Sequence, residues 1–498
     1  MEEITRRRFT GTAAMGAMGL AAMGLGMPNA ARTARAAEGS ATVDASAAAD
    51  APAGAASTPT FNGGPLLSSE QHETISEYDW TQGKLSIADI AAKAATMSDA
   101  EAQAILDNEP EITEDYVQQD GTVVPAVYIA LRNRINRNGL GLGNEVKDGC
   151  WDFLMHNFTE DEAAFYLKLP MYRYFNDEEA GEVADMDAEQ AKELCDDLSY
   201  RGLLNRVSRE GVHFYHTLAL AHGMLEFMLP RYEEPGFLDD TFGMYGSDYG
   251  YQSRNCGSAM YYAIPVNHEI VGDSKILPYN DWEKIIERNE CIAVAPCQCR
   301  TFTPLRNGEE PGTLCDHPME TCIATGEQAR YYIENGVGRQ IDQAEAKEIL
   351  QRSVDAGMVI QVMNTKQCDV ICSCHGDCCS ILKGYISLDG DVEALKYCSS
   401  YELKVDQEAC IQCGSCAERC PLFTITMDEK TGYPVVGNLC VRCGQCATVC
   451  PAGARTLVAR EQDERVRLPH DMIDDYHVKA LERAKRGYIQ DFGVSATK

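Results

Sequence analysis

Two copies of one cysteine motif constrain this chain more than any other feature of its sequence. The pattern C-x2-C-x2-C-x3-C-P occurs in residues 410–421 as CIQCGSCAERCP, and 30 residues further on, in residues 440–451, as CVRCGQCATVCP. Three cysteines at two-residue spacing surround one face of a compact cluster, while the fourth, followed by proline, points away toward a second one. Two such runs therefore predict two metal centres that exchange their fourth cysteine.

This exchange assigns four cysteines to each centre. The first centre takes Cys410, Cys413, Cys416 and Cys450, and the second takes Cys440, Cys443, Cys446 and Cys420. The arrangement closely resembles the bacterial two-[4Fe-4S] ferredoxins, whose fold is two pseudo-symmetric halves, and the resemblance covers residues 410–458. It implies two [4Fe-4S] clusters and one-electron transfer. Gly414 and Gly444, at matching positions, would leave room for backbone near inorganic sulfide.

Zinc or disulfides are the alternatives for these cysteines. Zinc sites commonly use C-x2-C pairs separated by longer loops, and they need neither a third cysteine at the same spacing nor a Cys-Pro ending. The 22 cysteines among 498 residues are also too sparse for a small disulfide scaffold. Four cysteines stand apart from all motifs, and we expect them to be buried structural thiols: Cys150, Cys195, Cys256 and Cys398.

The beginning of the chain is typical of an export signal. Residues 5–9, TRRRF, match the twin-arginine pattern, residues 11–27 form an uncharged stretch of modest hydrophobicity, and residues 34–36 offer an A-x-A cleavage site. The uncharged stretch is too short and too weakly apolar to favour a membrane anchor. The twin-arginine route carries folded, cofactor-loaded proteins, so we expect a periplasmic or extracytoplasmic location, and no other segment looks transmembrane.

The charge of the chain excludes one class of partner. The formal net charge is −32, and residues 1–37 carry +3, so the remainder carries −35. An acidic surface of this size repels phosphates, which argues against nucleic acid. It suits a basic redox partner, or solubility alone.

We expect an α+β multidomain fold. The predicted segments are a twin-arginine signal peptide (1–37), a flexible Ala/Ser/Pro-rich linker (38–60), a mostly helical region with a helix at 87–105 (61–147), a winged-helix-like domain (148–232), a cysteine-rich α+β domain (233–400), a two-[4Fe-4S] ferredoxin domain (401–460) and a helical tail with an amphipathic helix at 474–486 (461–498).

Residues 148–232 resemble a winged-helix domain. Thr159 with Glu162 forms a capping-box pattern, Asn176 and Asp187 are further N-cap candidates, and residues 204–207 and 212–215 predict a hairpin. The expected third helix carries four acidic residues against Lys192, which excludes DNA recognition and favours a scaffold or docking role. The nearby histidines are not expected to share a metal: His213, His216 and His222.

A second cysteine constellation precedes the ferredoxin motifs. Its three parts are residues 291–300, CIAVAPCQCR, residues 315–322, CDHPMETC, and residues 372–379, CSCHGDCC. A helix ending near Gly357 and an apolar run at 358–362 would return the third part toward the first. The set resembles a family of iron–sulfur oxidoreductase-associated proteins, with the resemblance covering residues 150–460. It departs from that family's pattern at Ser373, His375 and Asp377.

Closely spaced thiols suit a soft metal. We expect a third iron–sulfur cluster drawn from six candidates: Cys297, Cys299, Cys315, Cys322, Cys372 and Cys374. The preferred ligands are Cys297, Cys315, Cys322 and either Cys372 or Cys374, with Arg300 balancing thiolate charge. Zinc or disulfides formed after export are the alternatives. Adjacent Cys378 and Cys379 are a poor pair for one ion, so at least one of them is expected to be spare.

The leading hypothesis is an exported electron-transfer protein that serves a partner oxidoreductase, with no catalytic residue of its own. The alternative is a reductase whose substrate site lies in residues 291–379, with four polar candidates: Arg300, His317, Glu320 and His375. A weaker third hypothesis is a redox-sensing or assembly protein. The chain has no G-x-G-x-x-G motif in a βαβ unit and no haem C-x-x-C-H motif, so a self-sufficient flavin or nicotinamide enzyme is not expected.

Overall fold

The computed structural model describes a large part of the chain. The described residues are 60–61, 64–65, 96–118, 120–142, 148–234, 237, 256, 258, 261–266, 281–387, 399–461, 468–489 and 491–493. The chain divides into two compact units, residues 1–57 and 58–498, and every described residue belongs to the second. The predicted signal peptide, the linker up to residue 59 and the start of the helix expected at 87–105 lie outside the described residues.

The first part of the described chain is mainly helical. Its elements are β1 (Thr60–Phe61), β2 (Gly64–Pro65), α3 (Asp99–Asp107), β3 (Tyr116–Val117), β4 (Val123–Val124), α4 (Ala126–Asn136), α5 (Asp148–Asn157), α6 (Glu160–Tyr166), β5 (Phe175–Asn176), α7 (Asp177–Ala184), α8 (Ala188–Tyr200), β6 (Leu204–Arg209), β7 (Val212–Thr217) and α9 (Leu225–Phe227). Helix α4 was not anticipated, because its Asn, Val and Ile residues have only modest helix propensity.

The helices and hairpin predicted between residues 148 and 232 are present. Thr159 and Glu162 form the expected capping box of α6, and the side chains of Asn176 and Asp187 cap α7 and α8. Strands β6 and β7 pair in antiparallel fashion, and β5 adds to the outer side of β7. The local sequence thus determined both the helix starts and the turn of the hairpin.

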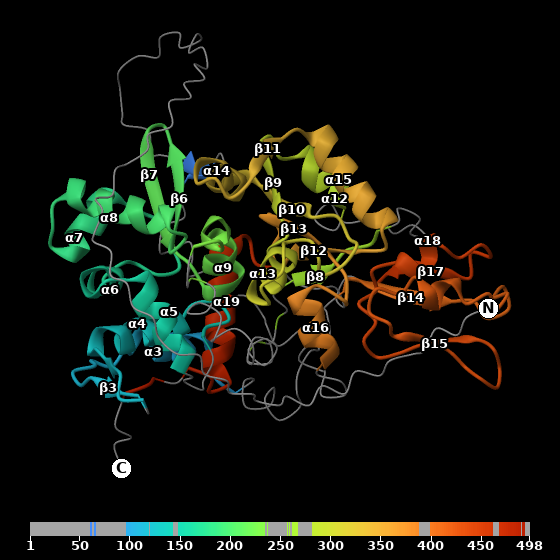
Figure 1. Ribbon diagram of the computed structural model, residues 1–498, viewed down its shortest axis with the longest axis horizontal. Helices are drawn as coiled ribbons and strands as arrows, with labels where there is room; N and C mark the ends of the chain where they lie inside the picture. Colours follow the sequence, from blue (N-terminus) through green and yellow to red (C-terminus); the bar gives the residue numbers. More distant parts are fainter. Residues whose placement is uncertain are drawn as a thin grey trace, which may run out of the picture. The chain divides into compact units, whose positions relative to one another are not determined.

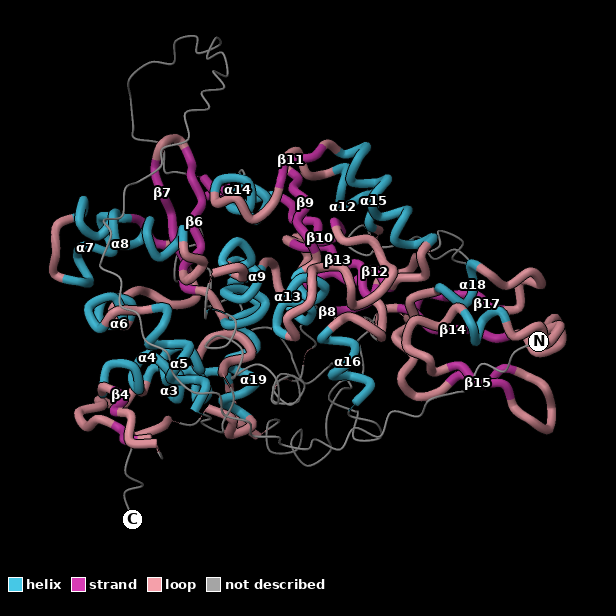
Figure 2. Tube along the Cα trace, in the orientation of Figure 1, coloured by secondary structure: helices cyan, strands magenta, loops and turns pink. Residues whose placement is uncertain are grey.

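A six-stranded antiparallel sheet forms the centre of the cysteine-rich region, in the order β11-β9-β10-β13-β12-β8 (Figure 2). The strands are β8 (Tyr261–Ala263), β9 (Ile292–Pro296), β10 (Glu320–Thr325), β11 (Arg339–Ile341), β12 (Val359–Met363) and β13 (Val370–Cys374). The helices of this region are α12 (Trp282–Glu287), α13 (Gln298–Arg306), α14 (Gly326–Glu334), α15 (Gln343–Asp355) and α16 (Ser380–Ser387).

This sheet is buried on both faces, and alternation along its strands separates two cores. In β9, Ala293 and Ala295 join the larger core, whereas Ile292 and Val294 join the smaller one beneath α12 and α15. Cys322 and Cys374 lie in the larger core. The sheet therefore presents small residues and thiols on one face and branched aliphatic residues on the other.

The ferredoxin motifs fold into two matching halves. Strand β14 (Tyr401–Val405) pairs with β17 (Arg455–Ala459), and β15 (Ile425–Met427) pairs with β16 (Pro434–Val436). A short helix lies within each cysteine run: α17 (Ser415–Glu418) in the first and α18 (Gln445–Thr448) in the second. Gly414 and Gly444 both adopt left-handed backbone, with φ of 80° and 85°, and so turn each chain into its helix. The sequence repeat is therefore also a repeat in backbone conformation.

Helix α19 (Met472–Lys485), expected in a tail, is a buried element that packs against α3 (Figure 1). Its charged residues are satisfied inside the protein: Lys479 pairs with Asp475, and Glu482 accepts hydrogen bonds from Ser258. The amphipathic helix predicted at 474–486 is therefore present, and its charged residues form internal ion pairs.

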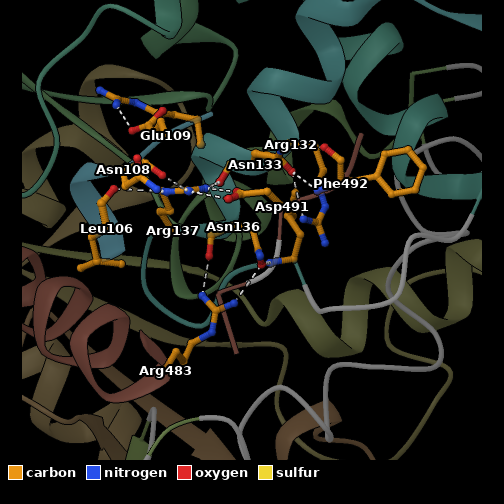
Figure 3. A network of polar contacts seen from close by, with 12 residues as sticks. Leu106, Asn108, Glu109, Arg132, Asn133, Asn136, Arg137, Arg483, Asp491 and Phe492 are labelled. Carbon is orange, nitrogen blue, oxygen red and sulfur yellow. Dashed lines mark hydrogen bonds and ion pairs between the residues drawn. The ribbon is translucent and has the colours of Figure 1, made fainter. Parts of the chain in front are cut away.

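Figure 3 shows the polar network that joins this last helix to α4. Arg483 donates to the Asn136 side chain at 2.8 Å, and Arg137 donates to Asp491 Oδ2 at 2.9 Å. Burial lowers the pKa of Arg483 to about 10. Because buried guanidinium groups are costly without partners, these contacts fix residues 483–491 against the first helices.

Within the described ranges, none of the helices has the length and apolar character required to cross a membrane.

Candidate metal centres

The four cysteines assigned to the second ferredoxin centre line one cavity. These are Cys420, Cys440, Cys443 and Cys446, with Leu422, Ile425 and Val441 among the apolar lining residues. Cys420 belongs to the first motif and the other three belong to the second. The fold therefore brings together the crossed set that the spacing predicts, around a space that a four-thiolate cluster fits.

The protonation of these thiols also fits a metal site. Burial raises the pKa of Cys440, raises that of Cys446 to about 12, and raises that of Cys443 well above its usual range. Metal ligands must be deprotonated, so such thiols ionise only when a cation is present to hold them. The buried Arg455 guanidinium lies beside Cys446, and its positive charge favours the thiolate form of that cysteine. A cation-free thiol site would not need this charge, whereas a negatively charged cluster is stabilised by it.

The first ferredoxin centre lies nearer to solvent. Cys413 is exposed, Cys410 and Cys450 are half-buried, and only Cys416 is buried. A hydrogen bond with Ser415 Oγ, at 3.4 Å, lowers the pKa of Cys413. Neighbouring Ile411 is 64% exposed, which leaves an apolar side chain on the surface at this motif. The two centres therefore differ in their access to an external partner.

The second centre faces the cysteine-rich region instead. The backbone N–H of Val266 donates to the Cys443 carbonyl at 2.9 Å, and the N–H of Gly376 donates to the Pro421 carbonyl at 2.9 Å. The fully buried Gln445 side chain donates to the Met358 carbonyl at 2.7 Å. These contacts place residues next to Cys420, Cys443 and Cys446 directly against the sheet and its loops.

Six thiols of the cysteine-rich region form one connected group, which we call the six-thiol group. Successive side-chain hydrogen bonds connect its members in the order Cys297, Cys299, Cys379, Cys374, Cys372 and Cys322. They come from the start of α13, from β10, from β13 and from the loop after β13. The antiparallel pairing of β10 with β13 accounts for the meeting of Cys322 and Cys372.

Cys299, the second member of this group, accepts hydrogen bonds from both of its neighbours. Hydrogen bonds from Cys297 and Cys379, with the Ser380 backbone N–H at 3.4 Å, hold the pKa of Cys299 well below its usual range. The pKa values of the donors Cys297 and Cys379 are raised, first by these same hydrogen bonds and then by burial. The group therefore holds one thiolate readily and further negative charge only with a bound cation.

One polar side chain near the six-thiol group has unmet hydrogen-bonding capacity. Gln361 is fully buried and is paired across the strands with Cys372, and neither of its amide atoms has a partner among the described residues. Buried polar groups are normally hydrogen-bonded, so these two orphaned atoms fit a region that holds a bound cofactor.

Cys315 lies elsewhere than predicted. Instead of joining Cys297 and Cys322, its thiol contacts Cys378, and the ligand atoms of Cys315, His317, Asp377 and Cys378 all lie within 4.8 Å of one another. Adjacent Cys378 and Cys379 therefore contact two different groups of side chains. That one of them is spare as a metal ligand stays a prediction.

The four polar residues proposed for a substrate site do not all lie together either. Arg300 is buried, donates to the Ser373 carbonyl at 3.4 Å and reaches Cys378 Sγ at 3.7 Å. The rings of His317 and His375 lie 4.5 Å apart. Glu320 points away from them into an exposed ion pair with Arg339. Three of the four candidates are thus brought together and the fourth is not.

The remaining histidines and cysteines behave as structural residues. His213 contacts Asp196, His216 contacts the Thr217 carbonyl, and His222 contacts Tyr261, so they share no site. Cys195 and Cys256 are buried as expected. The side chains of Cys150 and Cys398 lie outside the described residues. Sequence reasoning missed Gln361 and Arg455, because neither residue type is distinctive without its surroundings.

Comparison with known proteins agrees with the geometry of the ferredoxin half. Searches of curated proteins and of solved structures found no significant match. Residues 403–457 match the family model of the 4Fe-4S dicluster domain. This stretch contains all eight cysteines of the repeated motif, and it identifies the chain as an iron–sulfur protein with a ferredoxin-like domain.

Proposed function

We propose that this protein transfers single electrons to or from a partner oxidoreductase, using two [4Fe-4S] clusters held by residues 403–457. Such clusters supply one-electron redox chemistry at potentials set by burial, charge and hydrogen bonds to sulfur. The observation that carries the proposal is the cavity lined by Cys420 together with Cys440, Cys443 and Cys446. It unites the two motifs in the crossed pattern that two-cluster ferredoxins require.

The difference in exposure between the two centres supports a spatial order for electron transfer, with the first centre nearer to the partner. Cys413 and Ile411 lie at the surface, where a partner can approach the first centre. The second centre is enclosed, and its loop contacts the cysteine-rich region through Gly376 and Pro421. The residues of the ferredoxin domain thus connect an external partner with the six-thiol group inside the protein.

We infer further that the six-thiol group holds a third iron–sulfur cluster. Four of its thiols would be ligands, and we assign Cys297, Cys299, Cys379 and Cys374 because they are the first four consecutive members of the hydrogen-bonded order. The unmatched amide of Gln361 would then lie on the Cys372 side of the group, available to a sulfur acceptor.

The proposal also includes the cellular location of the protein and a docking role for its winged-helix-like region. The twin-arginine pattern supports export to the periplasm or the extracytoplasmic face, after insertion of the clusters. The acidic helix α8 and its neighbouring hairpin, which resemble a winged helix, would serve as a docking module for a protein partner.

One observation favours a second function, a reductase with its own substrate site. Gln361 and Arg300 place polar atoms without partners beside the six-thiol group. Polar groups of this kind could orient a small substrate at a cluster with an open coordination position. Turnover of a substrate by the isolated chain with an artificial electron donor would support this function. Dependence on a co-purifying catalytic subunit would support electron transfer alone.

Iron and acid-labile sulfide per chain, measured on anaerobically purified protein, test the proposal. We expect about twelve irons in the wild type and about eight in a Cys299→Ser, Cys374→Ser variant. Cys368→Ser is the matched control, since the Cys368 thiol is buried in the same region but bonds only to backbone. About eight irons in all three proteins would restrict the function to the ferredoxin domain. Fewer than about four in the wild type would contradict the proposal altogether.

A further inference from the structure

The structure points to a mononuclear metal site that is separate from all three iron–sulfur groups. We propose that Cys315, His317, Asp377 and Cys378 bind one divalent cation of the zinc class. Their ligand atoms, two thiols, one imidazole nitrogen and one carboxylate oxygen, all lie within 4.8 Å of one another. Zinc is bound by this mixture of sulfur, nitrogen and oxygen ligands, usually four in number.

The donor types favour a single ion over a cluster. Iron–sulfur clusters are held mainly by thiolates, and only two thiols are present here. Calcium and magnesium prefer all-oxygen sites, which excludes them. A borderline-soft cation that accepts thiolate and imidazole together remains the best match.

Neighbouring residues favour the charge and the orientation that these four side chains need to bind a cation. Arg300 Nη1 lies 3.7 Å from Cys378 Sγ, and its positive charge favours the thiolate there. His375 contacts Asp377 at 2.8 Å and packs against the His317 ring, so a neighbouring residue orients two of the four ligands. Partners that orient metal ligands in this way are typical of metal sites.

The site has one ligand that can exchange. Cys378 is buried and Cys315 and His317 are half-buried, whereas the Asp377 side chain is 41% exposed. Zinc sites in enzymes keep one open or exchangeable position beside three fixed ligands. We therefore assign Cys315, His317 and Cys378 as the fixed ligands and Asp377 as the ligand that water can replace.

The proposed cation site lies beside the contact between the cysteine-rich region and the ferredoxin domain. The ligands Asp377 and Cys378 flank the loop that begins at His375, and Gly376 of that loop donates to the Pro421 carbonyl of the ferredoxin domain. The His375 ring also packs against Phe423, with centroids 5.5 Å apart. A cation bound here would hold residues 315–317 to the loop that seats the ferredoxin domain.

Zinc content and Zn K-edge X-ray absorption of the full-length chain test this inference without interference from iron. We expect about one zinc per chain that survives dialysis against a chelator, with a first shell of about two sulfur and two nitrogen or oxygen atoms. His317→Ala should lose the zinc. Asp377→Ala should keep most of it with one ligand replaced by water. The control His470→Ala, at a distant cluster of potential ligands, should keep all of it.

Folding and function are monitored separately in these variants. Each variant should retain the iron content of the wild type, which shows that it is folded and keeps this test independent of the iron–sulfur proposal. Absence of retained zinc in the wild type would overturn the inference. So would equal zinc in the wild type and His317→Ala, a Cys315–Cys378 disulfide found by mass spectrometry, or loss of iron instead of zinc in His317→Ala.

Discussion

The ferredoxin domain and the cysteine-rich region both gather cysteines, but by different means. In the ferredoxin domain, eight cysteines lie within two short repeated runs, and each run shapes its own half through a left-handed glycine before a short helix. In the cysteine-rich region, eight thiols come from segments up to 82 residues apart, Cys297 to Cys379, and a sheet brings them together. One site is therefore local in sequence, and the other depends on tertiary structure.

This difference explains why spacing was informative in one region only. Within a repeated run, the chain length between cysteines limits where each thiol can lie. Between strands, the register decides which residues meet, and a shift of one residue moves every side chain to the opposite face. Strand β13 shows the alternation, because Cys374 faces the larger core whereas Ile371 faces the smaller one.

The largest effect is expected from changing the crossed ligand of the ferredoxin domain. Cys420→Ser should remove or alter the same cluster as Cys440→Ser, although Cys420 lies in the other motif. Cys450→Ser should instead match Cys410→Ser. Electron paramagnetic resonance of the reduced variants, with iron content, distinguishes the two clusters. If Cys420→Ser matched Cys410→Ser, the assignment of ligands within each run would have to replace the crossed one.

A smaller effect is expected where the two regions touch. A Cβ atom on Gly376 would lie 2.5 Å from the Pro421 carbonyl oxygen, so Gly376→Ala must push the loop away from the ferredoxin domain. Such overpacking costs about 1–3 kcal/mol, measurable by anaerobic denaturant unfolding. Gly308→Ala is a control, since its Cβ would meet nothing within 4 Å, although its positive φ carries a small cost. Equal destabilisation by both changes would contradict a close contact at Pro421.

A pH effect is expected from the cysteine-rich region but not from the exposed carboxylates of the ferredoxin domain. Burial, and then the charge of Asp471, raises the pKa of Asp369 from 3.8 to about 7. The folded state therefore binds a proton more tightly than the unfolded state, and this contribution to stability is lost as pH rises from about 4 through about 7. Unfolding free energies across this window should fall less for Asp369→Asn than for the wild type.

The control for this effect is Asp428→Asn in the ferredoxin domain. Asp428 is at the surface, and its pKa is lowered by hydrogen bonds from the Thr431 backbone. Its contribution is therefore lost only below about pH 4, outside the window in which Asp369 titrates. A wild-type stability that does not fall between about pH 4 and pH 7 would contradict the burial effect at Asp369.

The smallest effect is expected from the charge beside the second ferredoxin centre. Arg455→Gln removes a buried positive charge next to Cys446 and should make the reduced, more negative cluster harder to form. The reduction potential of that cluster should fall while the other is unchanged, as measured by a redox titration. Lys430→Gln, which removes an exposed charge from the same domain, should shift neither.

The sequence by itself determined the elements that depend on neighbouring residues. The capping box at Thr159, the caps at Asn176 and Asp187, and the helix that ends before Gly357 are all present as predicted. The ferredoxin domain, too, is confirmed by the family match to residues 403–457. Each of these depends on hydrogen bonds or turns within a few residues, so the local sequence contains the necessary information.

Only the tertiary structure decided which distant residues meet. It separated Cys315 from Cys297, paired Gln361 with Cys372, and buried α19, whose packing the sequence left open. It also directed the enclosed ferredoxin centre toward the sheet through Gly376 and Gln445. These outcomes depend on strand register and on the burial of charges in pairs, and neither is encoded in a short stretch of sequence.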